Sequence, residues 1–200
     1  MTSVLLSAIS AISLLIALAD DASAHTGIGI ATGFGHGFGH PFSGLDHILA
    51  MVAVGLYAAH LGGRAIYLVP MTFMAMMAVG GVLGIAGIGL PFVEIGIALA
   101  VIVLGAAVAL PINPPTVATM CLVGFFAVFH GHAHGAEMPV TSSGLTCGAG
   151  FILATSILHL IGIGAGMSVG LMAERHSRRI AQVGGGLMAV AGVLLLTGAL

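Results

Sequence analysis

A histidine, an aspartate and a second histidine stand close together before the first long apolar run of this chain. They are His40, Asp46 and His47, and the run continues through Met51 and Val54. Neutral imidazole and carboxylate groups bind borderline divalent metals such as Ni²⁺, Co²⁺ and Zn²⁺, whereas Mg²⁺ and Ca²⁺ prefer oxygen ligands alone. Ionisable groups in an apolar, membrane-type run mark functional sites. The motif therefore predicts transition-metal chemistry.

The spacing within this motif suggests how its side chains are arranged. Residues three or four positions apart share a helix face, so His40 would join Gly44 and His47 if the helix extends back past Pro41. Gly44 leaves space beside His47 for an ion or another backbone. Asp46 is costly in an apolar run and needs a partner or a wet cavity. The alternative is an Asp-His hydrogen bond that only caps the helix, and we favour a ligand.

A second cluster of metal-type side chains lies further along the chain. His130, His132 and His134 alternate with other residues, and Glu137 follows three positions later. In a loop or strand this spacing would point three imidazoles in one direction. We therefore expect a His-rich outer loop in which His134 and Glu137 are the preferred ligands, His130 comes next and His132 is least certain. A merely solvated, scavenging segment is the alternative.

Three isolated residues extend the candidate set. Glu94, at the start of a later apolar run, either joins the first site or only compensates a helix dipole. His36 lies in the Gly-rich stretch 27–39, for which no stable helix is predicted. His159, inside another run, either lines a conduction path or bonds a neighbouring carbonyl. The predicted metal ligands are His36, His40, Asp46, His47, Glu94, His130, His134 and Glu137.

Composition indicates an integral membrane protein. The 200 residues are 59% hydrophobic and 5% charged, a balance that a soluble domain of this size does not need. A net charge of −2 offers no basic surface for nucleic acid. Cys121 and Cys147 lie in apolar stretches without CxxC spacing, so neither a disulfide nor a zinc finger is predicted.

Six apolar runs have the length of spanning helices, about 20 residues each. They cover residues 42–62, 66–88, 91–110, 115–133, 144–170 and 179–199. Glycine, proline and charged residues occupy the breaks between them. These runs predict an all-α, polytopic membrane protein with a single six-helix domain over residues 25–200.

A signal peptide is predicted over residues 1–24. The apolar run Val4 to Leu18 is short for a span and is followed by Ala22-Ser-Ala24, a small-residue cleavage pattern. An uncleaved helix is the alternative, because no Lys or Arg precedes the run. Cleavage would place the mature N-terminus outside, and alternation then puts all four arginines inside, as the positive-inside rule asks. We expect a bacterial inner-membrane protein whose metal-type ligands face the periplasm.

These motifs resemble the HupE/UreJ family of hydrogenase- and urease-associated membrane proteins, read as nickel permeases. The resemblance covers nearly the whole mature chain and rests on His40-Pro-x-x-Gly44-x-Asp46-His47-x-x-x-Met51, Glu94 and His134-x-x-Glu137. The first motif is also similar to the His-x₄-Asp-His signature of the nickel/cobalt transporter family, with one extra residue. The resemblance implies metal supply to a cytoplasmic nickel enzyme, either urease or hydrogenase.

Transition-metal uptake is therefore the predicted function, with Ni²⁺ as the ion that the resemblance implies. Co²⁺ and Zn²⁺ fit the same ligand types. The chain has no Walker A sequence for ATP hydrolysis. No enzymatic activity and no permanent cofactor are predicted. Two alternatives stay open: a metalloenzyme that retains its ion, and an assembly or sensing factor that passes metal to a maturation partner.

Overall fold

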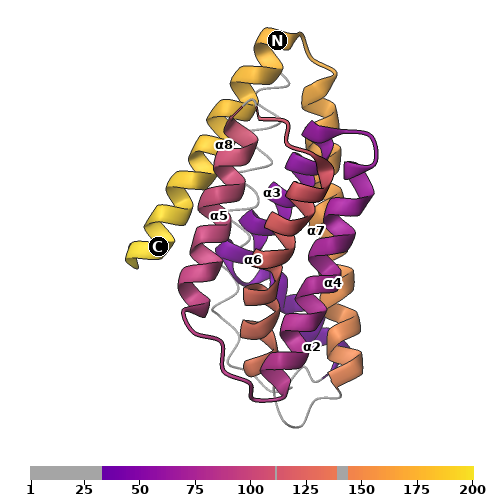
Figure 1. Cartoon of the computed structure of the whole chain (residues 1–200), viewed down its shortest axis with the longest axis vertical. Helices are drawn as coiled ribbons and strands as arrows, with labels where there is room; N and C mark the ends of the chain where they lie inside the picture. Colours follow the sequence, from indigo (N-terminus) through magenta and orange to yellow (C-terminus); the bar gives the residue numbers. More distant parts are fainter. Residues whose placement is uncertain (1–32, 111, 139–143) are drawn as a thin grey trace.

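The computed structural model describes residues 33–110, 112–138 and 144–200. Within these ranges the chain forms helices joined by turns, without a strand. The elements are α2 (Phe34–Gly39), η2 (His40–Phe42), α3 (Leu45–Leu61), α4 (Ala65–Ile85), α5 (Val93–Ala109), α6 (Thr116–Ala136), α7 (Gly144–Gly170) and α8 (Glu174–Thr197). The long helices lie side by side (Figure 1). The all-α prediction is confirmed, while the signal peptide predicted over residues 1–24 lies outside the described residues.

The described helices make this a multi-pass membrane protein. Four of them, α4, α6, α7 and α8, are long and apolar enough to cross a membrane. The segments Phe34–Phe42 and Leu45–Leu61 form a fifth candidate if they are counted as one span bent by 81°. Helix α5 is apolar but has 17 residues, shorter than a typical span. Six spans therefore stay a prediction, with four or five candidates by length and composition.

Two expectations about the His-bearing segments are wrong. Helix α6 continues to Ala136, so the expected His-rich outer loop is helical. Glycine alternates with histidine there, and Gly131 lies directly against the α4 backbone, so tertiary packing overrides weak helix propensity. Likewise Phe34–Gly39, part of the Gly-rich stretch, forms the short helix α2. Its Gly37 lies against the carbonyl group of Cys147, where a Cβ would collide.

Glycine also explains how the long helices pack. A Cβ added at Gly80 of α4 would collide with the carbonyl oxygen of Val128 in α6. One added at Gly162 of α7 would collide with the carbonyl oxygen of Val52 in α3. In a bilayer, where lipid is as apolar as the side chains, such close backbone approach lets van der Waals packing hold helices together. Gly80 and Gly162 thus let two pairs of helices approach closely.

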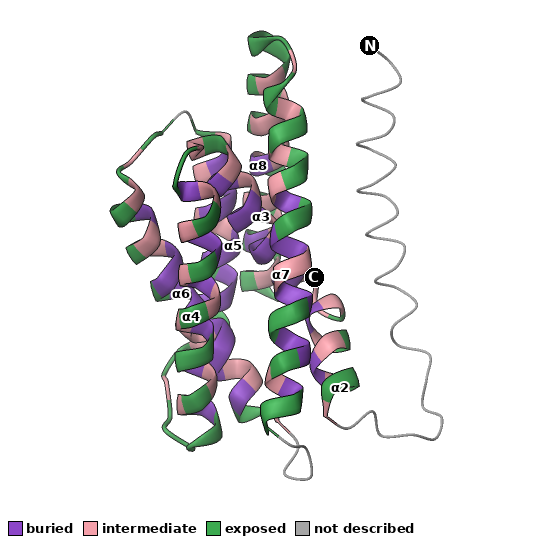
Figure 2. Cartoon of the chain, turned by 90° about the vertical axis from the view of Figure 1, so that its right-hand side faces the viewer, coloured by how far each residue is buried: buried purple, intermediate pink, exposed green. Residues whose placement is uncertain are grey.

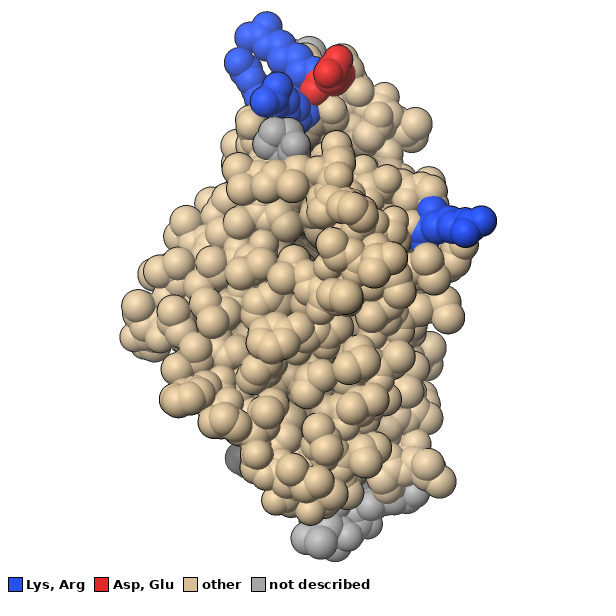
Figure 3. Space-filling view, in the orientation of Figure 1, with Lys and Arg blue, Asp and Glu red and all other residues tan. Residues whose placement is uncertain are grey.

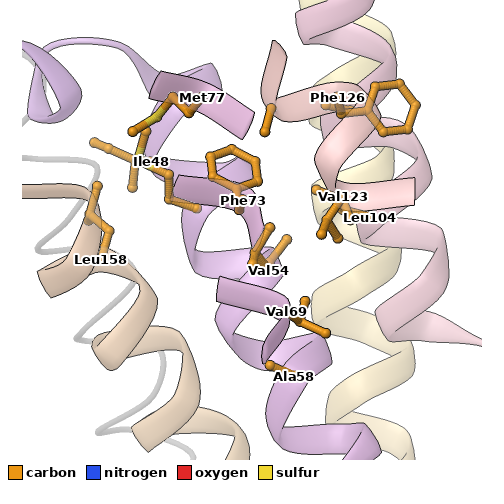
Figure 4. Close-up of a cluster of buried hydrophobic side chains, with 14 of the residues drawn as sticks. Ile48, Val54, Ala58, Val69, Phe73, Met77, Leu104, Val123, Phe126 and Leu158 are labelled. Atoms are coloured by element: carbon orange, nitrogen blue, oxygen red, sulfur yellow. The ribbon is translucent and has the colours of Figure 1, made fainter. Parts of the chain in front are cut away.

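The buried core lies where α3, α4, α6 and α7 meet. Phe73, Val54 and Leu158 are fully buried members of this core (Figure 4). Exposed residues lie on the outward faces of the helices (Figure 2). Many of them are large and apolar, as expected for surfaces that contact lipid. Helix α8 lies at the edge of the bundle and packs mainly on α5. Two of these core helices, α3 and α6, also carry candidate ligands.

The arginines lie at one end of the bundle. Arg64 precedes α4, and the other three lie in the first turns of α8, which begins at Glu174 rather than at the predicted residue 179. Helix α8 runs antiparallel to α5, because Gly105 lies near Gly185 while Ile102 lies near Gly192. Basic side chains accordingly gather towards the end where α8 begins (Figure 3). Glu94, in the first turn of α5, is at the opposite end.

Candidate metal site

Six predicted ligands line one hollow of about 220 Å³ at the end of the bundle away from the arginines. They are His40, Asp46, His47, Glu94, His134 and Glu137. They come from η2, the start of α3, the start of α5 and the end of α6, which meet at this point. The hollow is large enough for an ion with several water molecules. The fold thus brings together three motifs that are far apart in the sequence.

Asp46 and His47 form the best-defined contact in the hollow. Nδ1 of His47 lies 2.6 Å from Oδ1 of Asp46. An ionised carboxylate can only accept a hydrogen bond, so Nδ1 carries the proton and donates it. Nε2 of His47 then has a free lone pair, and it is buried without a hydrogen-bond partner among the described residues. This carboxylate-histidine arrangement is the one that orients metal-binding imidazoles.

Gly44 makes room for this pair. A Cβ added there would lie 2.5 Å from Oδ1 of Asp46 and 2.8 Å from Nδ1 of His47. Gly44 is also the extended residue that precedes α3, so it turns the chain from η2 into the helix that carries the pair. The space predicted beside His47 is present, and the Asp-His pair itself fills it.

His134 lies between the other two histidines of the hollow. Its ring centroid is 4.4 Å from that of His47 and 4.6 Å from that of His40. Both of its ring nitrogens are buried and lack a hydrogen-bond partner in the described ranges. The ring of Phe151, from α7, packs against it at a centroid distance of 4.1 Å. His134 therefore has its two donor atoms uncommitted beside the Asp46-His47 pair.

Two exposed glutamates complete the lining. Nε2 of His40 lies 3.9 Å from Oε2 of Glu137, the residue that directly follows α6. Glu94 lies in the first turn of α5, where the helix dipole also favours a carboxylate. It follows Phe92, which has a left-handed backbone with φ of 60°. Glu94 also lines the same hollow as Asp46, so its position is compatible with either role.

The remaining two predicted ligands lie on either side of the hollow. His36 lies next to His40, with ring centroids 5.7 Å apart, and lines a larger neighbouring hollow of about 770 Å³. His130 lies deeper, its ring centroid 5.4 Å from that of His47. Its Nδ1 lies 3.2 Å from the carbonyl oxygen of Phe126, and its Nε2 is buried without a partner in the described part of the chain. The histidines thus form a row from the bundle end inward.

His132 does not belong to this row. Its Nε2 donates to the carbonyl oxygen of Ile88, 2.8 Å away, and so ties α6 to the α4–α5 turn. On a helix, His130 and His134 are four positions apart and share a face, whereas His132 lies on another face. The helical conformation therefore separates the three imidazoles that a loop or strand would have pointed together.

The donors line the walls of the hollow rather than meeting at a point. Among the described residues, no three His, Cys, Asp or Glu side chains are arranged to hold a metal ion. Side chains must therefore move before an ion can contact three of these donors at once. Such a site differs from a preformed structural metal site, in which the ligands already have the geometry of the bound ion.

The sequence matches a known family over most of its length. Residues 13–195 match the family described as HupE / UreJ protein. The chain belongs to the HupE/UreJ family. It is 49% identical over 185 residues to Protein HupE of Rhizobium leguminosarum bv. viciae, covering 92% of this chain and 95% of that protein. No solved structure matches the chain. The resemblance predicted from the motifs is confirmed.

In this HupE/UreJ protein, two phenylalanines that the sequence alone did not identify as site residues lie beside the histidines. Phe151 packs on His134, and Phe73 lies between His130 and His159, at ring-centroid distances of 5.7 and 5.3 Å. Both come from apolar runs, where a phenylalanine has the same pattern as any core residue. Only their place in the fold distinguishes them from the other core aromatics.

Proposed function

We propose that this HupE/UreJ protein is a permease for a divalent transition metal, with Ni²⁺ as the ion that the family implies. The observation that carries the proposal is the Asp46-His47 pair, which leaves the buried Nε2 of His47 with a free lone pair beside the hollow. Imidazole and carboxylate together are the ligand set for borderline divalent ions. In this account the ion is the substrate, not a resident cofactor.

Uptake begins at the open end of the hollow. His36 and His40 collect the ion, and Glu94 and Glu137 provide negative charge that attracts it. Asp46, His47 and His134 then replace part of its water shell, with His130 behind them. Because the donors among the described residues do not converge on one point, binding costs side-chain reorganisation and stays weak enough for release.

No nucleotide is needed to drive this movement. An inside-negative potential favours entry of a divalent cation by about 4.6 kcal/mol per 100 mV, twice the value for one charge. That free energy supports a concentration ratio of roughly a thousand. The proposal is therefore electrically driven facilitated uptake.

We place the protein in the bacterial inner membrane with the hollow facing the periplasm. All four arginines lie at the far end of the bundle, which the positive-inside rule assigns to the cytoplasm. This orientation includes six spans, with the bent α2–α3 segment and the short α5 counted, and a cleaved signal peptide. The family name and the related Protein HupE support a link to hydrogenase or urease maturation.

Chelator washing of the purified protein separates this function from a metal-retaining enzyme. A permease loaded with Ni²⁺ should lose it to a chelator and bind it again reversibly, with His47→Ala abolishing the rebinding. Stoichiometric metal that survives the washing would contradict the permease and favour an enzyme. Reversible binding without entry into sealed vesicles would favour an accessory factor that passes metal on.

A further inference from the structure

His159 is a buried histidine that the proposed outer site does not use. It lies in the middle of α7 with a relative exposure of 2%. Neither of its ring nitrogens has a hydrogen-bond partner among the described residues. Buried polar side chains are almost always hydrogen-bonded, and an exception needs an explanation. The predicted alternative, a bond to a neighbouring carbonyl, is not found in the described ranges.

The position of His159 continues the row of imidazoles that begins at the hollow. The ring of His47 is followed by that of His130, and Phe73 then lies between His130 and His159. Phe73 is fully buried at the centre of the core (Figure 4). The Nε2 of His130 and both nitrogens of His159, none with a hydrogen-bond partner in the described ranges, therefore belong to rings that both contact Phe73.

Thr155 adds an oxygen donor on the same side as His159. It precedes His159 by four residues on α7, so the two side chains share a helix face. Thr155 is fully buried, and its Oγ1 also lacks a hydrogen-bond partner in the described part of the chain. An imidazole and a hydroxyl, neither with a hydrogen-bond partner among the described residues, thus lie buried on one face of α7.

We propose that His159, assisted by Thr155, is a second and inner binding station for the transported metal, reached past Phe73 from the outer hollow. The inference rests on the proposed permease function. Nitrogen and oxygen donors suit the same class of borderline divalent ion. A station with only two protein donors leaves the other ligand positions to water and binds weakly, as a step in conduction must.

The first test compares flux with binding in the full-length protein. His159→Leu replaces the imidazole with an apolar side chain of similar size. This variant should lower potential-driven Ni²⁺ entry into proteoliposomes by roughly tenfold or more. Ni²⁺ affinity of the outer hollow, measured in detergent, should stay unchanged. His176 is an exposed histidine in α8, and His176→Leu is the control. It should change neither the Ni²⁺ entry nor the Ni²⁺ affinity. Unchanged entry in His159→Leu would overturn the inference and leave the permease standing.

A second variant tests direct contact with the ion. His159→Cys, made with Cys121→Ala and Cys147→Ala, places one thiol at the station. A thiolate is a soft ligand, so Cd²⁺ bound there should give a cadmium-thiolate absorption band. A purely structural role for His159 predicts no such band, and that result would overturn the inference. The absorption band reports binding at equilibrium and does not require transport. Failure of the wild-type protein to move Ni²⁺ would instead count against the proposed permease function.

Discussion

Oδ1 of Asp46 lies 2.6 Å from Nδ1 of His47, its neighbour in the first turn of α3. This contact assigns the proton to Nδ1 and leaves Nε2 as the donor atom for a metal. Asp46→Asn should weaken Ni²⁺ binding by roughly 10- to 100-fold, because an amide orients the imidazole less strictly than a carboxylate. Isothermal titration of the purified protein measures the change.

A matched control for Asp46→Asn is available at the other end of the bundle. Glu174→Gln removes one negative charge at the start of α8, far from the hollow. Its Ni²⁺ affinity should equal that of the unmodified protein. Equal losses in the two variants would mean that net charge, rather than the Asp46-His47 contact, determines binding.

Two histidines of α6 should respond differently to truncation. His134→Ala removes two uncommitted ring nitrogens from the hollow and should abolish most Ni²⁺ binding with little loss of stability. His132→Ala leaves the Ile88 carbonyl without its partner and should cost about 1–3 kcal/mol of stability, with metal affinity retained. Thermal unfolding in detergent and isothermal titration, applied to both variants, test this separation. The reverse pattern would contradict the assignment.

Close packing of α4 and α6 should matter for the site as well as for the fold. A Cβ at Gly131 would collide with the carbonyl group of Met77, so Gly131→Ala should destabilise the protein by about 1–3 kcal/mol. It should also weaken Ni²⁺ binding, because His130 is the adjacent residue. Gly164→Ala, which meets nothing within 4 Å, should leave stability equal or higher. Equal unfolding temperatures for the two variants would refute this packing argument.

Metal binding should weaken as the pH falls. The imidazoles of His40, His47 and His134 must be neutral to bind an ion, so protons compete with the metal. The Ni²⁺ affinity should therefore fall, and at no point rise, as the pH is lowered. A titration series in buffers that do not bind metal checks the sign, and an affinity that rises as the pH falls would contradict imidazole ligands.

Much of the fold was predictable from hydropathy. The run 144–170 coincides with α7, because a long apolar segment without proline or charge has few other options in a membrane. The His130–His134 segment was misassigned, because its alternating glycines have low helix propensity and the compensating contact with Met77 on α4 is not local. The bend of 81° before α3 was likewise not predicted, and α2 beyond it packs on α7, a contact that is distant in the sequence.

Residues that line the hollow could be selected from the sequence, but their spatial relations to one another could not. Asp46 and His47 were identifiable because a carboxylate beside an imidazole in an apolar run is costly without a function. Their shared hollow with His134 was not deducible, since no spacing rule links α3 to the end of α6. The position of Phe73 between two imidazoles was not deducible either, because the three side chains come from three different helices.

Radiolabelled Ni²⁺ entry into sealed proteoliposomes that contain only this chain tests the central claim most directly. The vesicles carry an imposed inside-negative potential, and Asp46→Ala protein in matched vesicles is the control. We expect Ni²⁺ accumulation that depends on the potential and is lost in Asp46→Ala. Entry no faster than into protein-free vesicles, or equal entry with Asp46→Ala, would contradict it.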